Sequence, residues 1–425
     1  MMTSTRPPEK SPLARSAKSS PVRQQVKKPA SAGLHIALVT ETWRPEINGV
    51  AMTLGRLTDG LRQMGHRFTL VRPRQHAQDL AAKEANLREI LVAGCPIPGY
   101  RGLRFGLPAK ARLLSAWLED RPDVIQVATE GPLGASAMAA AQQLDIPIVS
   151  EFHTNFHAYS RHYGFAWIEG LVAMHLRRLH NKSAVTLAPT FAVANELTNA
   201  GYKTVRVVSR GVDTSLFNPQ RRSAALREAW GVKADELVVA YVGRLAAEKN
   251  LPLVVQAFNS IRQAIPTARL LFVGDGPLRS KLERSDPSFI FVGMRRDEDL
   301  ATHYASADLF LFTSLTETFG NVTLEALASG LAVLSYDCAA ASELIRDGDN
   351  GRTVPANQPQ AFISAATELA RNPIQIQTLR ERAHQSVRHL DWAEISGDLS
   401  DVFYHTIKSH QRQQNAELIF RFAPD

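Results

Sequence analysis

The sequence predicts an α/β protein with two doubly wound parallel sheets that face each other across a cleft. Short apolar runs alternate with amphipathic helical stretches along most of the 425 residues, and this alternation is typical of parallel βαβ units. It occurs in two series, at 34–209 and from about residue 235 onward, with a joint at 210–221 that contains Gly and Pro. Ligands of such sheets bind beyond the carboxyl ends of the strands, so we expect the working site between the two sheets.

The first series opens with an apolar run at 34–40, which we predict to be a buried strand. The helix after it carries apolar residues from Val50 to Met64 at spacings of three and four, and Gly65 is its expected end. The further strands that we predict in this series lie at 68–71, 89–93, 123–128, 146–152, 184–188 and 204–209.

The second series has strands of the same kind at 237–242, 268–273, 289–292, 308–312 and 332–335. The chain is helical again after Pro373, and we expect its last helical stretch to pack back across the joint. These patterns predict a disordered basic tail at 1–33, doubly wound domains at 34–209 and 210–390, and a helical segment at 391–425.

The composition excludes several classes of protein. Hydrophobic residues make up 44% and charged residues 21%, as in ordinary globular proteins, and no apolar run is long enough to span a membrane. Two cysteines, Cys95 and Cys338, provide neither a disulfide framework nor the close spacing of a zinc site. We therefore expect a cytoplasmic protein.

Most of the net charge of +8 comes from the first 33 residues, which hold seven basic residues against one acidic residue. This segment has no aromatic residue and many Ser and Pro residues, so it cannot bury enough apolar surface to fold. We expect a solvated tail, with attachment to anionic lipid or binding of nucleic acid as alternatives. The remaining chain is almost neutral, and we expect no nucleic-acid partner.

The second series carries the clearest site motifs. The strand that ends at Gly243 is followed by Arg244 and Lys249, and two cations near a helix N-terminus suit a diphosphate. Two glutamates, Glu317 and Glu325, lie eight residues apart, one in a loop after a strand and one inside the next helix. Taken alone, these residues also fit a solvated loop and a helix with charged ends.

The first series adds Gly49, at the start of its first helix, where a ligand could approach the backbone. His153 ends the strand at 146–152, so we expect it to project into the cleft, with a purely structural role as the alternative. The acidic pairs at 297–299 and 347–349 belong to a polar helix and a turn. We expect no metal, because two cations can neutralise a diphosphate without one.

Together and in this order, the motifs resemble those of retaining glycosyltransferase family 4, which has the two-domain GT-B fold. The resemblance covers about residues 34–395 and implies two Rossmann-like domains, the first on the acceptor side and the second binding the nucleotide sugar. The motifs that carry it are Asn48-Gly49-Val50, the His153 segment, 210–213, Gly243-Arg244 with Lys249, 273–276 and the Glu317 and Glu325 pair.

The resemblance also implies a role for each motif residue in the second domain. Arg244 and Lys249 hold the donor diphosphate and stabilise charge on the departing nucleotide. Glu317 orients the hydroxyls of the transferred sugar, and Glu325 binds the ribose. The resemblance implies further donor-binding residues. The nucleotide base is bound by Gly293 and Met294, and the transferred sugar by the loop residues Phe319, Gly320, Asn321 and Val322.

In the first domain, the resemblance implies that Gly49 leaves room for phosphate and that His153 contacts the sugar or the acceptor hydroxyl. The family keeps the α configuration of the donor, and no carboxylate nucleophile is established in it. We therefore predict front-face substitution, in which an oxygen of the leaving phosphate helps to deprotonate the acceptor. A trapped glycosyl-enzyme intermediate would count against this mechanism.

Within the family, the segments 40–50 and 153–164 resemble α-mannosyltransferases that act on glycolipids. They are also similar to transferases that build sulfoquinovosyl or glucuronosyl diacylglycerol. We expect no cofactor, a GDP-mannose donor with a UDP-sugar as the alternative, and a lipid or glycan acceptor. A GT-B epimerase or phosphorylase is a further alternative, because it shares the fold.

The stretch 101–117 interleaves basic and apolar residues. This pattern suits reversible, peripheral contact with the anionic surface on the inner face of a membrane. The alternative is an ordinary surface helix that packs on the sheet. The basic residues of this stretch are Arg101, Arg104, Lys110 and Arg112.

Overall fold

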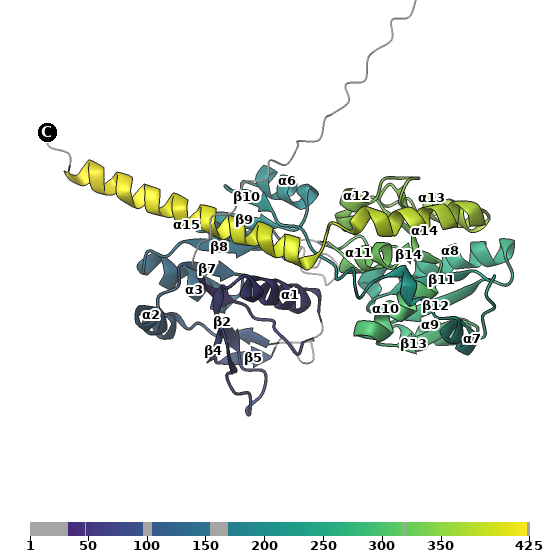
Figure 1. The fold of residues 1–425 in the computed structure, drawn as a ribbon, viewed down its shortest axis with the longest axis horizontal. Coiled ribbons are helices and arrows are strands. Elements are labelled where there is room, and N and C mark those ends of the chain that lie inside the picture. The colour runs from purple at the N-terminus through teal and green to yellow at the C-terminus, as the bar shows by residue number, and fades with distance from the viewer. Residues whose placement is uncertain (1–32, 47, 97–103, 154–168, 318, 423–425) are drawn as a thin grey trace, which may run out of the picture. The chain divides into compact units, whose positions relative to one another are not determined.

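The computed structural model describes residues 33–46, 48–96, 104–153, 169–317 and 319–422 (Figure 1). The chain from Gly33 onward is one compact unit that contains two large, mainly parallel sheets. The fold class predicted from the sequence is therefore confirmed. The predicted basic tail at 1–33 lies, apart from Gly33, outside the described residues.

The first sheet has eight strands in the order β10-β9-β8-β7-β1-β2-β4-β3, and only the β3–β4 pair is antiparallel. The order reverses at the central pair β1–β7. The strands are β1 (His35–Val39), β2 (Arg67–Pro73), β3 (Lys83–Glu84), β4 (Leu87–Val92), β7 (Val124–Val127), β8 (Ile148–Glu151), β9 (Val185–Ala188) and β10 (Val205–Val207). A separate two-stranded sheet consists of β5 (Gly94–Pro96) and β6 (Arg104–Gly106).

Helices cover both faces of the first sheet, namely α1 (Gly49–Gln63), α2 (Lys110–Glu119), α3 (Pro132–Gln143), α5 (Glu169–His180), α6 (Phe191–Asn199) and α15 (Trp392–Phe422). In β1, Ile36 and Leu38 belong to the hydrophobic cluster that includes α1 and α15, whereas Ala37 and Val39 belong to the cluster that includes α2 and α3. Because both faces of the strand are buried, its sequence is a continuous apolar run.

The long C-terminal helix α15 packs on the first sheet rather than the second, and it runs beside α1 (Figure 1). Leu399 and Phe403 share a hydrophobic cluster with Leu57 and Leu61 of α1. The two helices approach closely at Gly60, where an added Cβ would lie 2.2 Å from Oγ of Ser396. The domain boundaries given above stay a prediction.

The second sheet has six parallel strands in the order β13-β12-β11-β14-β15-β16, and its order reverses at the pair β11–β14. This pair is the topological switch point at which doubly wound sheets bind ligands. The strands are β11 (Val238–Val242), β12 (Arg269–Val273), β13 (Ile290–Gly293), β14 (Leu309–Phe312), β15 (Ala332–Tyr336) and β16 (Arg352–Val354).

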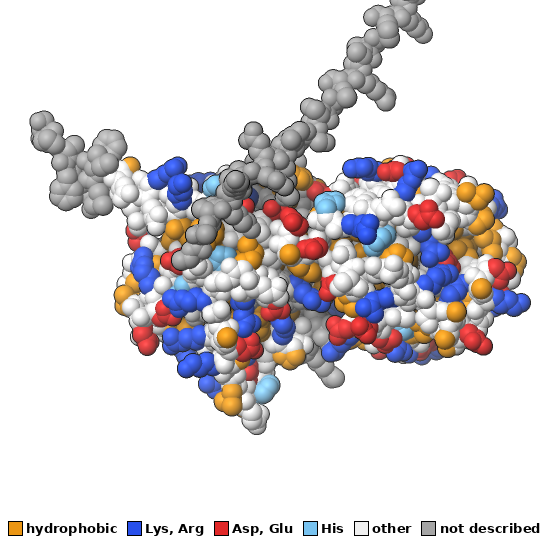
Figure 2. All heavy atoms as spheres, in the orientation of Figure 1, with side chains coloured by type: hydrophobic (Ala, Val, Ile, Leu, Met, Phe, Trp, Pro, Cys, Tyr) orange, Lys and Arg blue, Asp and Glu red, His pale blue; other side chains and the backbone are white. Residues whose placement is uncertain are grey.

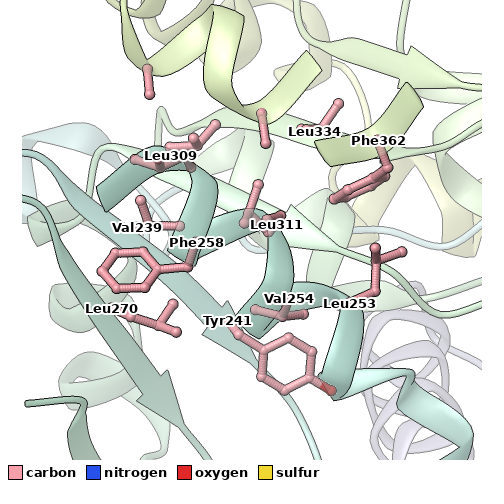
Figure 3. Packing of buried hydrophobic residues seen from close by; sticks show 14 of the residues in the cluster. Val239, Tyr241, Leu253, Val254, Phe258, Leu270, Leu309, Leu311, Leu334 and Phe362 are labelled. Atoms are coloured by element: carbon pink, nitrogen blue, oxygen red, sulfur yellow. The ribbon is translucent and has the colours of Figure 1, made fainter. Parts of the chain in front are cut away.

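Helices also cover both faces of the second sheet. Figure 3 shows one face, where Phe258 of α8 (Leu251–Ala264) and Phe362 of α13 (Pro359–Ala370) belong to one hydrophobic cluster with the strand residues Val239, Leu309 and Leu311. The other face packs against α10 (Asp297–Ser306), α11 (Asn321–Ala328) and α14 (Pro373–Val387). The shorter helices are η2 (Pro219–Arg221), α7 (Ala224–Ala229), η3 (Ala247–Lys249), α9 (Arg279–Ser285) and α12 (Ala339–Leu344).

Charged side chains of both signs are interspersed over the face of the described residues seen in Figure 2. This distribution agrees with the almost neutral charge that the sequence assigns to the chain beyond its tail. It offers no continuous basic track of the kind that nucleic-acid backbones bind on that face.

Candidate functional site

The candidate site lies at the carboxyl ends of the strands of the second sheet, on either side of the switch point. Arg244 follows β11, Glu317 follows β14, and Gly293 ends β13 with Met294 directly after it. Parallel strands end at one edge of a sheet, so the fold places these separate motifs along the same edge.

An ion pair joins the two sides of the switch point. Nζ of Lys249, the last residue of η3, contacts Oε1 of Glu317. The two side chains are 16% and 20% exposed, respectively. Oγ1 of Thr313, just beyond β14, donates to the carbonyl oxygens of Lys249 and Asn250 at 3.0 and 3.1 Å. The backbone of Lys249 is thereby fixed to the neighbouring strand.

Arg244 has its own carboxylate partner. Nη2 of Arg244 contacts Oε1 of Glu248, four residues later. The arginine side chain is 45% exposed, whereas that of Glu248 is only 6% exposed. Beneath this pair, the hydroxyl of the buried Tyr241 donates to the carbonyl oxygen of Arg244 at 3.3 Å. Both cations that the sequence assigns to a diphosphate therefore lie next to a carboxylate.

The loop that leads into α11 brings the predicted sugar-binding residues together. Phe319 is buried in the core, and Gly320 caps α11 with a φ of 85°, which favours glycine. Asn321 and Val322 begin the helix, so their N–H groups have no partner within it. A Cβ added to Gly49, the first residue of α1, would lie 3.8 Å from Nδ2 of Asn321.

Glu325 lies one turn into α11 and is buried. Its Oε2 accepts a hydrogen bond of 3.0 Å from the hydroxyl of Tyr304, a fully buried residue of α10. Burial raises the pKa of Glu325 to about 7, and the bond from Tyr304 opposes this rise only in part. The bond from Tyr304 holds the Glu325 side chain in place. Its carboxylate oxygens can accept hydrogen bonds, as binding of the two hydroxyls of a ribose requires.

The two residues predicted to read the base lie at the end of β13. Gly293 has a φ of 73°, and its carbonyl oxygen accepts a bond of 2.8 Å from the N–H of Gly274 beyond β12. Met294 exposes more than half of its surface. An exposed apolar side chain beside a glycine turn offers a surface on which a planar base can lie.

His153 follows β8 in the first sheet and is buried. Its Nδ1 accepts a bond of 2.8 Å from Nη2 of Arg210, and its Nε2 lies 2.6 Å from Oε2 of Glu151. Glu151 also accepts a bond from Gln126. Burial raises the pKa of Glu151, but the interactions with His153, Arg210 and Gln126 outweigh burial and hold this pKa below its ordinary value.

Comparison with known proteins identifies the family. A family model described as "Glycosyl transferases group 1" matches residues 236–372, and one described as "Glycosyltransferase Family 4" matches residues 47–216. A GDP-mannose-dependent alpha-mannosyltransferase of Corynebacterium glutamicum is 30% identical over 382 residues, which are 89% of this chain and 91% of that protein. The chain belongs to glycosyltransferase family 4. The resemblance stated from the motifs is thereby confirmed.

Other relatives of this glycosyltransferase have different names. A sulfoquinovosyl transferase of Arabidopsis thaliana is 30% identical over 354 residues, 81% of this chain and 68% of that protein. Among solved structures, sucrose-phosphate synthase from Thermosynechococcus elongatus has a TM-score of 0.74 at 19% identity and covers 88% of this chain and 100% of its own. This similarity supports the GT-B fold.

The glycosyltransferase brings most of the predicted donor residues to one edge of the second sheet, whereas His153 lies in the first sheet. Its ring is buried between Glu151 and Arg210, and its projection into the cleft stays a prediction. A contact with an acceptor hydroxyl requires the ring to leave one of these partners.

The predicted basic stretch also differs in structure. Arg101 lies outside the described residues, and Arg104 belongs to β6, where its Nη2 donates to the carbonyl oxygen of Gly94 at 2.6 Å. Lys110 and Arg112 are exposed on α2. The apolar residues Leu113 and Trp117 of this helix are buried against the first sheet, so they are not available to a membrane.

Four partner residues of the site were not predicted. Glu248 is the easiest to find, because it lies four residues after Arg244 and adjoins Lys249 in sequence. Arg210 begins one of the motifs shared with the family, yet no role was given to it. Glu151 lies two residues before His153 at the end of β8, so this contact is local in sequence and could have been found from the strand prediction. Tyr304 carries no sequence signal, since its contact with Glu325 depends on how α10 and α11 pack.

The described residues contain neither a metal cluster nor a membrane-spanning helix. No group of three or more His, Cys, Asp or Glu side chains among them could hold a metal ion. No helix in the same part of the chain combines the length and the apolar character needed to cross a bilayer.

Proposed function

We propose that this glycosyltransferase moves a hexose from a nucleotide sugar to an acceptor hydroxyl with retention of the α configuration. The observation that carries the proposal is the placement of two cations and two sugar-binding candidates around one switch point. Arg244 and Lys249 bind the diphosphate, Glu317 binds sugar hydroxyls, and Glu325 binds the ribose. Gly293 and Met294 bind the base.

Substitution takes place on one face of the sugar in the proposed mechanism. The bond between the anomeric carbon and the diphosphate oxygen breaks, and the acceptor oxygen bonds to that carbon from the same side. The acceptor proton passes to the departing phosphate oxygen, while Arg244 and Lys249 stabilise the negative charge that develops there.

The proposed donor is GDP-mannose. The similarity to a GDP-mannose-dependent alpha-mannosyltransferase over nearly the whole chain supports this choice. A UDP-sugar is the second candidate, as the resemblance to transferases that build sulfoquinovosyl diacylglycerol implies. A sulfoquinovosyl transferase has an equal identity over a shorter stretch, which keeps this alternative open.

A thermal-shift panel of GDP- and UDP-sugars, with and without a divalent metal, tests the donor. A donor at about 100 times its dissociation constant adds about 3 kcal/mol to the free energy of unfolding. We expect stabilisation by GDP-mannose, independent of metal. Stabilisation by UDP-sugars alone would indicate that the enzyme transfers a hexosyl or uronosyl group from a UDP-sugar. A rise in melting temperature that requires the metal would contradict metal independence.

We further propose that the acceptor hydroxyl belongs to a glycolipid and that the enzyme meets it by peripheral contact with an anionic membrane. The exposed Lys110, Arg112 and Leu118 of α2 support this contact. We expect co-sedimentation with vesicles that contain anionic lipid at low salt, and release at high salt. Equal recovery with neutral vesicles, or none with anionic ones, would contradict membrane contact.

A further inference from the structure

The ion pair between Lys249 and Glu317 joins two groups that the proposed function uses for different parts of the donor. In the proposed function, Lys249 binds the diphosphate and Glu317 binds hydroxyls of the transferred sugar. In the structure, Nζ of Lys249 contacts Oε1 of Glu317 across the switch point of the second sheet. A carboxylate in this position offsets the positive charge that a diphosphate requires.

The neighbouring pair shows that both cations of the site lie beside a carboxylate. Arg244 and Glu248 carry opposite charges, as do Lys249 and Glu317, so the four formal charges cancel. Glu248 is almost fully buried behind its arginine. Glu317 is the more exposed of the two carboxylates and is therefore the one that a ligand can draw away from its cation.

The backbone at the lysine end of this ion pair is held in place. Thr313 holds the carbonyl oxygens of Lys249 and Asn250, and Asn250 has a φ of 53° at the start of α8. The lysine stem is thereby fixed at its base, next to the loop that carries Glu317. Nζ of Lys249 therefore needs only rotations about the bonds of its own side chain to change partner.

We propose that this ion pair makes diphosphate binding depend on the attached sugar, so that the site prefers a nucleotide sugar to the free nucleoside diphosphate. With a sugar present, its hydroxyls bind Glu317 and Lys249 is left to the phosphate oxygens. Without a sugar, the carboxylate stays beside Lys249 and offsets its charge. The inference rests on the proposed function and adds a physical reason for release of the nucleotide product.

The test compares dissociation constants for GDP with GDP-mannose and for UDP with UDP-glucose by isothermal titration calorimetry. The variants are Glu317→Gln, Lys249→Gln, the double variant, and Glu298→Gln, which removes an exposed carboxylate from α10 as a matched control. Ligand-observed NMR extends the measurement to weak binding, and circular dichroism checks the fold. Couplings between bound groups are commonly about 5- to 150-fold.

We expect Glu317→Gln to bind the free nucleoside diphosphate about tenfold more tightly than the wild type and to lose most of the preference for the nucleotide sugar. In the Lys249→Gln background, the same substitution should leave nucleoside diphosphate affinity nearly unchanged. Glu298→Gln should match the wild type.

Two results would overturn the inference alone. In one, Glu317→Gln weakens only the nucleotide sugar and leaves the nucleoside diphosphate unaffected, so that the glutamate acts on the sugar by itself. In the other, the gain for the nucleoside diphosphate is the same with and without Lys249, as direct repulsion of phosphate by the glutamate requires. Absence of any nucleotide binding by the wild type would instead overturn the proposed function and this inference together.

Discussion

Replacement of Lys249 by alanine is expected to lower kcat/KM for sugar transfer by about 100- to 1,000-fold while the protein stays folded. The lysine is one of two cations assigned to the charge that develops on the departing diphosphate. Its ion pair with Glu317 is partly solvated, so its loss should change the free energy of unfolding by about 1 kcal/mol or less. Initial transfer rates and denaturant unfolding measure the two effects.

The control for this variant is Lys281→Ala on α9, which removes an exposed lysine from the same sheet assembly. It should transfer sugar at the wild-type rate. Wild-type transfer by Lys249→Ala would contradict the placement of the diphosphate at the switch point. A matching loss of stability would instead assign the defect to folding.

Replacement of Glu325 by glutamine is expected to stabilise the protein at pH 8 and to weaken donor binding about tenfold. Burial raises the pKa of this carboxyl to about 7, from an ordinary value of 4.5. Between these two values the folded state keeps a proton that the unfolded state releases, so the wild type loses stability as the pH rises. The shift corresponds to about 3 kcal/mol. Glutamine removes the free-energy cost of a buried negative charge, and its side-chain oxygen can still accept the hydrogen bond from Tyr304.

Unfolding free energies of both proteins at a series of pH values test this prediction. The advantage of Glu325→Gln should be full above pH 7 and should vanish as the pH falls toward 4.5. The surface variant Glu298→Gln should show no such dependence. Equal stabilities at pH 8 would mean that the carboxylate is solvated better than its burial indicates, and an unchanged donor affinity would remove Glu325 from the ribose site.

The longer strands of both sheets could be predicted from the sequence because they are covered on both faces. Continuous apolar runs such as those of β1 and β14 have no other simple interpretation at that length. The short strands β3, β5, β6 and β16 contain two or three residues each and include charged or glycine residues. Such segments pair only because the neighbouring strand is already in place, so local sequence does not reveal them.

In the site, too, some features follow from the local sequence and others depend on the packed fold. Positions at or just beyond a strand end, such as Gly293 and Arg244, follow from the strand prediction itself. The partner of each side chain does not, because Lys249 and Glu317 are 68 residues apart and their contact depends on the strand order β11–β14. His153 shows the limit most clearly, since its position after a strand follows from the sequence, whereas its burial and its bond from Arg210 depend on the packed fold.

The packing of α15 on α1 has a consequence for how the chain folds during synthesis. The apolar face around Leu57 and Leu61 stays uncovered until Leu399 and Phe403 have been made, about 340 residues later. At roughly 5–20 residues per second, the ribosome needs about 17–70 seconds for that interval. The second sheet can therefore complete its core while the apolar surface of α1 in the first is still exposed, so the N-terminal half reaches its final packing last.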